Sequence, residues 1–171
     1  MTYEDWEVTV PDVIKIDRIW RVQAFRLASY LSACAESDTR SMADDRRYLP
    51  LAAQLCRAAG SVPANIAEGY PRQSPKDRVR YYEYALGSTE EVKTWYLSLR
   101  ELLPSNRLDE RLSLLRSITR LLLTMIRSSR PPHPPPPPRN PASPPPRRSR
   151  DRLSLFRDPR PFALDTSGTR A

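Results

Sequence analysis

The stretch Arg57-Ala-Ala-Gly-Ser-Val-Pro-Ala-Asn-Ile-Ala-Glu-Gly-Tyr70 decides the fold of this chain of 171 residues. Apolar residues recur every three or four positions through it, which predicts an amphipathic helix from about Pro50 to Gly69. Pro63 lies inside this helix, and because proline has no N–H donor we expect a kink there. Asn65 is placed to bond backbone groups that the kink frees, and Gly69 is a usual residue at a helix end.

The sequence on either side predicts three more helices. Ser74-Pro75-Lys76-Asp77 combines a capping serine, a proline at the first helical position and an acid three residues after the cap. The helix that it starts is expected to run to about residue 103, and a fourth helix is expected at about 106–127. Before the central stretch, helical spacing predicts a helix from residue 12 or 17 to 37. No stretch alternates like a strand, so we predict an all-α fold, an antiparallel four-helix bundle.

Composition divides the chain near residue 128. Eleven of the sixteen residues from Pro131 to Pro146 are proline, which is typical of polyproline II or disorder. We therefore predict a flexible N-terminus at 1–11, the bundle at 12–127 and a disordered Pro/Arg-rich tail at 128–171. Residues 1–127 hold 19 Lys+Arg and 17 Asp+Glu, a net charge of +2, whereas the tail holds nine Arg and three Asp, a net charge of +6. A basic tail of this kind favours polyanions as partners, although it could equally serve only as a solvated extension.

Two segments resemble a family of small bacterial four-helix-bundle proteins. Residues 57–69 follow the family's central pattern, and Ala85-Leu86-Gly87-Ser88 with Glu90 or Glu91 follows its next segment. The family includes proteins encoded by intervening sequences in 23S ribosomal RNA genes and the accessory variability determinant proteins of diversity-generating retroelements. The resemblance covers about residues 15–127, and the tail has no counterpart. After Gly69 the family commonly has an aromatic residue and a glycine, where this chain reads Tyr70-Pro71.

The resemblance implies a four-helix protomer that assembles into a homopentameric ring and has no enzyme activity. In the retroelement branch, the similar protein binds the reverse transcriptase and nucleic acid. The intervening-sequence branch has no defined function. The matched motif is explained by helix geometry rather than by a ligand, and its residues are Pro63, Asn65, Glu68 and Gly69.

A group of basic residues at the junction of the second and third predicted helices is the first candidate nucleic-acid site. It comprises Arg72, Lys76, Arg78 and Arg80, with Arg57 nearby in sequence, and tyrosines are interleaved with it. Basic side chains neutralise phosphates and aromatic rings stack on unpaired bases. The alternative is that these arginines pair with Asp77, Glu83 or Glu68. The tail supplies a second candidate set: Arg139, Arg147, Arg148, Arg150 and Arg152.

A row of aromatic residues suggests a subunit interface. Tyr81, Tyr84 and Trp95 share helical spacing on a face that differs from the core stripe of the third predicted helix. The alternative is that they are partly buried within one bundle.

The residue types in the chain provide few candidates for a catalytic site or a metal site. The only histidine, His133, lies in the proline tract, so a Ser-His-Asp or Cys-His site on a rigid scaffold is not expected. Cys34 and Cys56 are expected to be buried and reduced, and they are too few for a zinc site. We predict no enzyme activity, no metal and no cofactor. With neither a signal peptide nor a long apolar run, the protein is expected to be cytoplasmic and not bound to a membrane.

These observations predict a non-enzymatic oligomer that binds RNA or DNA, or a nucleoprotein partner. The retroelement resemblance adds a reverse transcriptase as a candidate partner. The alternative is a protein-interaction scaffold whose proline-rich tail recruits a protein, without nucleic-acid binding.

Overall fold

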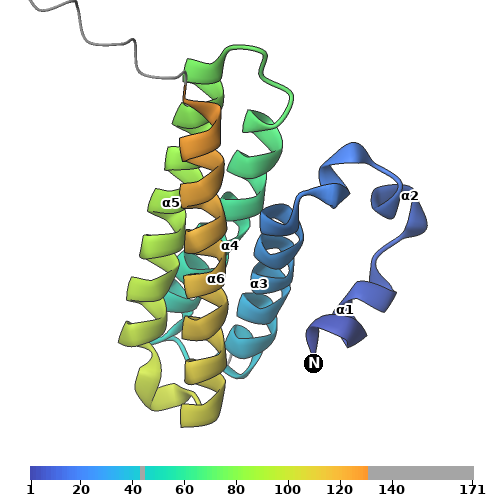
Figure 1. Ribbon diagram of the computed structural model, residues 1–171. Helices are drawn as coiled ribbons and strands as arrows, with labels where there is room; N and C mark the ends of the chain where they lie inside the picture. The colour runs from blue at the N-terminus through green and yellow to red at the C-terminus, as the bar shows by residue number, and fades with distance from the viewer. Residues whose placement is uncertain (43–44, 131–171) are drawn as a thin grey trace, which may run out of the picture. The chain divides into compact units, whose positions relative to one another are not determined.

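A computed structural model describes residues 1–42 and 45–130, and four long helices dominate them (Figure 1). They are α3 (Gln23–Thr39), α4 (Leu49–Gly69), α5 (Pro75–Ser98) and α6 (Ser105–Ser129). Each helix runs opposite to the next, α4 packs on α3 and α5, and α6 packs on α5 and α3. The predicted all-α fold and antiparallel four-helix bundle are therefore confirmed.

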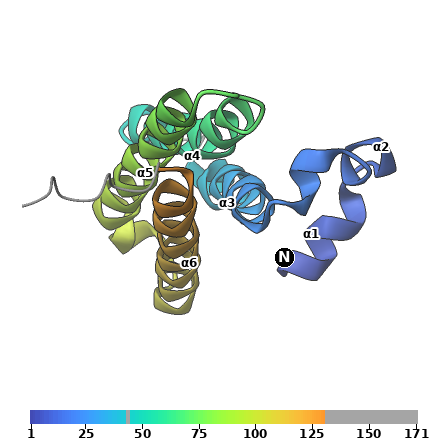
Figure 2. The same cartoon turned by 45° about the horizontal axis from the view of Figure 1, so that its top comes forward.

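The first long helix begins later than the sequence predicts. Residues 3–21 form short elements instead, which are α1 (Tyr3–Thr9), α2 (Asp12–Lys15) and the 3₁₀ helix η1 (Arg18–Arg21). Asp17 caps η1 by accepting a hydrogen bond from the Ile19 N–H at 3.4 Å, and Val22 adopts an extended backbone that separates η1 from α3. These two local features divide the helix that was predicted from residue 12 or 17. We call residues 1–22 the N-terminal arm; Figure 2 shows it beside α3.

Aromatic side chains hold the N-terminal arm against α3. Trp6 and Trp20 are buried with Tyr30, and the Trp6 ring lies 6.0 Å from Trp20 and 5.6 Å from Tyr30 between centroids. Such rings bury about 150–250 Å² each and add favourable edge and face contacts. Residues 1–11, which the sequence predicts as a flexible terminus, thus contain a helix whose Trp6 belongs to a packed cluster. The hydroxyl of Tyr30 also donates a hydrogen bond to the Met1 carbonyl at 2.8 Å.

The predicted helix signals act as expected at the other boundaries. The Ser74 hydroxyl accepts a hydrogen bond from the Asp77 N–H at 3.3 Å, and Pro75 opens α5. The α5 helix ends at Ser98 and gives way to the 3₁₀ helix η3 (Arg100–Leu102), so the predicted helix to residue 103 changes type in its last turn. At its other end, α4 begins at Leu49 with Pro50 in the first turn.

The core lies between the four long helices and is made of their inward stripes. Leu31, Leu55, Val62, Tyr96 and Leu122 are fully buried in it. Each such side chain contributes about 1.5–3 kcal/mol by leaving water. Cys34 is also buried, as predicted, whereas Cys56 is half-buried, and neither forms a disulfide.

The motif around Pro63 behaves differently from the sequence expectation. The Asn65 side chain donates a hydrogen bond to the Ser61 carbonyl at 2.8 Å. The carbonyl that loses its partner through Pro63 is that of Ala59, four residues earlier, so Asn65 does not bond the group that the proline frees. Asn65 instead binds the backbone one turn before it on the same helix, and the helix continues through the proline to Gly69.

Gly69 serves close packing rather than an unusual backbone angle. No residue in the described part of the chain has a positive φ. A Cβ atom built on Gly69 would lie 2.9 Å from the Cβ of Tyr81 and 3.0 Å from a ring carbon of Tyr82. A side chain at position 69 would therefore push the start of α5 away from the end of α4.

Candidate nucleic-acid interface

The basic junction between α4 and α5 is assembled, but its arginines bind groups of the same chain. Arg72 donates hydrogen bonds to Glu68 at 3.0 Å and to the Tyr81 hydroxyl at 3.3 Å. Arg78 donates two bonds to the Arg72 carbonyl, at 3.1 and 2.6 Å. Arg80 pairs with Asp77 at 3.6 Å. The alternative that these arginines pair with nearby acids is thus what the structure shows for Arg72 and Arg80.

Tyr81 lies between two of these arginines. The guanidinium carbons of Arg72 and Arg80 lie 5.0 and 5.6 Å from its ring centroid. Cation–π contacts at this distance contribute about 0.5–1 kcal/mol when exposed. The ring face that was predicted to stack on a base is therefore occupied by Arg72 and Arg80.

Two members of the predicted basic set have other surroundings. Lys76 is exposed and makes no ion pair within the described ranges. Arg57 is also exposed, but it lies twelve residues before Gly69, which is about 18 Å along a helix. The structure therefore does not bring Arg57 to the junction. The tail arginines Arg139, Arg147, Arg148, Arg150 and Arg152 lie outside the described residues.

The predicted aromatic face divides into two parts. Tyr81 and Tyr84 form an edge-to-face pair with centroids 6.0 Å apart, and Tyr84 is 53% exposed. Trp95 lies about 21 Å further along α5, is half-buried against the central core, and donates from Nε1 to Glu91 at 3.2 Å. The three side chains therefore do not form one continuous patch. Their role in a subunit interface stays a prediction.

The sequence interpretation missed a row of arginines on α6. Arg116, Arg120 and Arg127 are exposed, and among residues 1–42 and 45–130 none of them makes an ion pair. At 100° per residue, the three side chains leave the helix within an arc of about 40° and span about 17 Å of its length. We call Arg116, Arg120 and Arg127 the α6 arginine row.

A simple sequence signal would have identified this row. From Arg111 to Arg130 the chain has five arginines and no aspartate or glutamate. Arg111 is buried, and Arg130 pairs with Glu83 on α5 at 3.0 Å, which leaves the α6 arginine row to face solvent. Arg116 also borders a hollow of about 350 Å³ with Glu90 and Lys93, whose charges are paired with each other.

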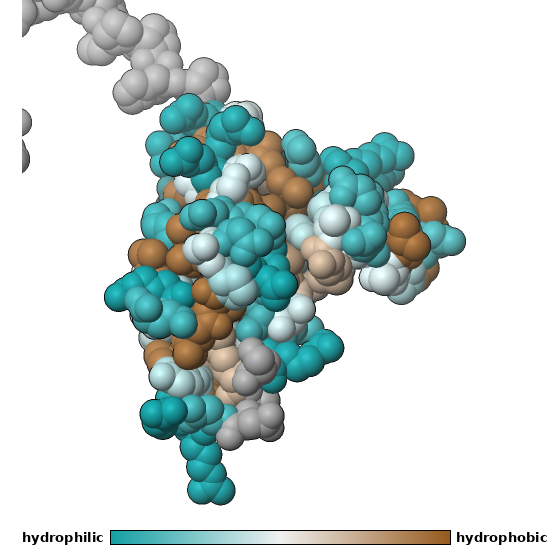
Figure 3. All heavy atoms as spheres, turned by 90° about the horizontal axis from the view of Figure 1, so that it is seen from below, coloured by the Kyte–Doolittle hydropathy of each residue, from teal (hydrophilic) through white to brown (hydrophobic). Residues whose placement is uncertain are grey.

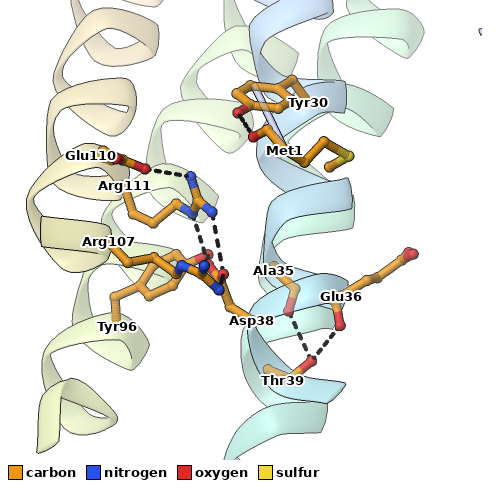
Figure 4. A network of polar contacts seen from close by, with 10 residues as sticks. All are labelled: Met1, Tyr30, Ala35, Glu36, Asp38, Thr39, Tyr96, Arg107, Glu110 and Arg111. Atoms are coloured by element: carbon orange, nitrogen blue, oxygen red, sulfur yellow. Dashed lines mark hydrogen bonds and ion pairs between the residues drawn. The ribbon is translucent and has the colours of Figure 1, made fainter. Parts of the chain in front are cut away.

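A buried polar cluster at the other end of the bundle is the second place where charges gather (Figure 4). Asp38 of α3 accepts from Arg111 of α6 at 2.8 and 3.2 Å and from the Tyr96 hydroxyl of α5 at 3.0 Å. The Arg107 guanidinium lies 3.6 Å from the same carboxylate. Burial raises the pKa of Tyr96, and the Asp38 charge raises it further. Burial alone would lower the pKa of Arg111, but its bonds to Asp38 outweigh this and raise it.

This cluster has the properties of a structural tie. Every polar group in it has a partner, its acid is fully enclosed, and it connects α3, α5 and α6. Within the described residues, no three His, Cys, Asp or Glu side chains are grouped to hold a metal ion. The helices of this part of the chain also include none that is long and apolar enough to cross a membrane.

Comparison with known proteins identifies the family. The profile of the family described as 23S rRNA-intervening sequence protein matches residues 23–124. The chain is also similar to the crystal structure of a protein with unknown function from the S23 ribosomal protein family of Bacteroides thetaiotaomicron. That match has 19% identity and a TM-score of 0.57, and it covers 61% of this chain and 98% of the other. No curated protein matches the chain. Because the profile spans α3, α4, α5 and most of α6, the chain belongs to the 23S rRNA-intervening sequence protein family.

Proposed function

We propose that this protein is a non-enzymatic, self-associating protein that binds nucleic acid through the α6 arginine row. The observation that carries the proposal is the row itself: three exposed arginines on one helix face, to none of which an acidic side chain of residues 1–42 or 45–130 is bound. Arginines that are not neutralised by the protein can neutralise phosphates and release their counterions.

The contrast with the α4–α5 junction supports this choice of site. At the junction, binding a phosphate would require Arg72 or Arg80 to leave an existing acid and the Tyr81 ring. At the α6 arginine row no such contact with the described part of the chain has to be broken. Contacts of arginine with phosphates position a nucleic acid but read no sequence, so the binding is expected to tolerate many sequences.

The tail and the assembly extend the proposal. The tail arginines that the sequence analysis named add cations to the same chain, and several copies joined in one ring would multiply weak contacts through effective concentration. The family resemblance supports a homopentamer. The family and the similar structure are both named for ribosomal components, so a 23S rRNA fragment is the first RNA to use as a probe.

A salt series tests the proposal. The full chain and the Arg116→Ala/Arg120→Ala/Arg127→Ala variant are titrated against a labelled single-stranded 23S rRNA fragment. The slope of log K against log salt is negative, and loss of three phosphate contacts should make it shallower by about 2, because each contact contributes about 0.7 for a single strand. A variant with lysine at the same three positions should keep most of the native salt dependence, because it keeps the three positive charges.

A charge-matched control separates the row from net charge. Arg72→Ala/Arg80→Ala/Arg100→Ala removes three arginines that are each paired with an acid. We expect this control to bind nearly as the native chain does. Equal losses in both triple variants would show that net charge, not the α6 arginine row, drives binding, and no binding by the native chain at low salt would refute the proposal.

A protein partner is the second candidate function. The proline-rich tail supports it, since grooves lined by aromatic residues recognise such segments. The retroelement resemblance supports a reverse transcriptase as that partner. A pull-down with full chain and with residues 1–130 tests the candidate, because a tail-dependent partner would be lost on truncation.

A further inference from the structure

The N-terminal arm exposes apolar side chains that nothing in the bundle covers. Val8, Val13 and Ile16 are 80%, 68% and 81% exposed, and Ile14 is 42% exposed. Figure 3 shows hydrophobic surface at the right-hand end of the molecule, where Figure 1 places α2. Four large apolar residues within nine positions are far more than the scattered single ones that are normal on a surface. The arm also precedes residue 23, where the family match begins.

The exposed residues are presented on a fixed element. Trp6 and Trp20 on either side of α2 are buried against Tyr30 of α3, so the arm is attached at both of its ends. A surface that is held in place before association loses less conformational freedom when a partner binds. The arrangement therefore favours docking of the arm without a change in its conformation.

The charge of the arm selects the kind of partner. Residues 1–22 contain five acidic and three basic residues, whereas residues 23–130 contain seventeen basic and twelve acidic residues. An acidic arm is repelled by nucleic acid and by a second acidic arm. The surface that complements it is basic and apolar, and the rest of this same chain carries a net charge of +5 over residues 23–130.

A groove with these properties lies at the end of the bundle where α6 finishes. It has a volume of about 870 Å³, and Tyr70, Tyr82 and Met125 line it together with Arg78. The last residues of the arm form its other wall, where Asp17, Arg18 and Ile19 lie. Aromatic and aliphatic side chains suit the valine and isoleucine side chains of α2. The two arginines suit acids such as Asp12, whose side chain is 98% exposed and lies 3.8 Å from Lys15. Arg78 keeps N–H donors beyond the two that bind the Arg72 carbonyl.

We propose that the arm of one copy docks in this groove of the next copy. The exposed side chains from Val8 to Ile16 do not line the groove, so the contact is heterologous and each copy uses both surfaces, which builds a ring when the rotation closes. The inference deepens the proposed function, because it rests on the self-association part of it and names the interface. A pairing of two arms is disfavoured by their like charge.

Complementation between two damaged copies tests this interface in the full chain. The arm variant is Val13→Ser/Ile16→Ser, and the groove variant is Tyr70→Ser/Ser128→Glu; all four positions are exposed, so the core stays intact. Light scattering after size-exclusion chromatography should find each variant monomeric when alone. Mixed in equal amounts, the two should form a 1:1 dimer, since one intact arm and one intact groove remain. Leu49→Ser, a 49% exposed leucine at the other end, should assemble as the native chain does.

The outcomes are distinguishable. Circular dichroism melts show whether each variant is folded, and a folded arm variant that keeps the native mass overturns the inference while self-association stands. Two monomeric variants that do not combine also overturn it, because their defects are then unrelated. A native chain that is monomeric at micromolar concentration overturns both this inference and the self-association, whereas RNA binding is measured separately and can survive it.

Discussion

An arginine meets an acid at each end of the bundle, and the two pairs differ in their access to water. At one end Arg111 binds Asp38, and their side chains are 7% and 0% exposed. At the other end Arg72 binds Glu68, and their side chains are 45% and 52% exposed. The distances are similar, 2.8 and 3.0 Å, so geometry alone does not separate them.

The difference shows that burial, not the contact distance, sets the worth of an ion pair. An exposed pair competes with water and is worth about 0–1 kcal/mol. A buried pair costs several kcal/mol to desolvate, and the same cost makes the loss of one partner severe, because the other charge then remains in the interior without a partner. The Asp38 end is therefore expected to determine stability, and the Arg72–Glu68 pair is expected to contribute little to it.

The largest effect should come from removing the buried acid. Asp38→Ala leaves Arg111 buried without its carboxylate and leaves the Tyr96 hydroxyl without an acceptor. We expect the free energy of unfolding to fall by about 3–5 kcal/mol. Urea unfolding followed by circular dichroism measures it.

The matched control removes the exposed acid. Glu68→Ala takes away the carboxylate of Arg72 at the end of a helix, where a negative charge is not favoured by the helix dipole. We expect a change within about 0.5 kcal/mol. A loss for Glu68→Ala as large as for Asp38→Ala would mean that burial does not distinguish the two ends.

The sequence predicts one end of this comparison much better than the other. Arg72–Glu68 and Arg80–Asp77 are three or four residues apart, and the sequence analysis named Glu68 and Asp77 among the acids that these arginines could bind. Asp38 and Arg111 are 73 residues apart, and no local pattern connects them before the bundle is assembled. The packing of the N-terminal arm was not predicted for the same reason, because Trp6 and Tyr30 come into contact only after the chain has reversed direction.

The candidate site was predictable in part. The start of α5 followed from a serine cap and a proline, which act within a few residues. The α6 arginine row follows from the absence of acids between Arg111 and Arg130, although only the structure shows that Arg111 points inward and Arg130 is paired. Gly69 was assigned to a helix end, and its packing role requires knowing where Tyr81 lies.

A medium effect should come from Gly69→Ala, which tests close packing at the junction. The new methyl group would meet the Cβ of Tyr81 at 2.9 Å, and because that neighbour is tied to the backbone, α4 and α5 must move apart. We expect a loss of about 1–3 kcal/mol. Gly87 lies within α5, and a methyl group added there would have no neighbour within 4 Å. We therefore expect Gly87→Ala to raise the free energy of unfolding by about 0.5–1 kcal/mol. A gain in stability for both variants would contradict the close-packing role of Gly69.

The smallest effect compares two tyrosine hydroxyls, one on a buried tyrosine and one in an exposed pair. Tyr30 is buried and donates to the Met1 carbonyl at 2.8 Å, whereas the Tyr81 hydroxyl accepts from Arg72 in an exposed pair at 3.3 Å. Tyr30→Phe should cost about 0.5–1.5 kcal/mol at neutral pH, and Tyr81→Phe should cost less.

The pH dependence of the Tyr30→Phe difference provides the sharper measurement. Burial raises the pKa of Tyr30 from 10.0 to about 12. Between pH 10 and 12 the unfolded chain releases the Tyr30 proton while the folded chain keeps it, so the folded state binds more protons and loses stability as pH rises. The native chain should therefore lose stability faster than Tyr30→Phe in this window, and its advantage over the variant below pH 10 should shrink and then change sign, because two pKa units correspond to about 2.7 kcal/mol. Denaturant unfolding at several pH values measures this. A difference that stays constant from pH 7 to 12 would show that the Tyr30 hydroxyl is as accessible to water in the folded protein as in the unfolded chain.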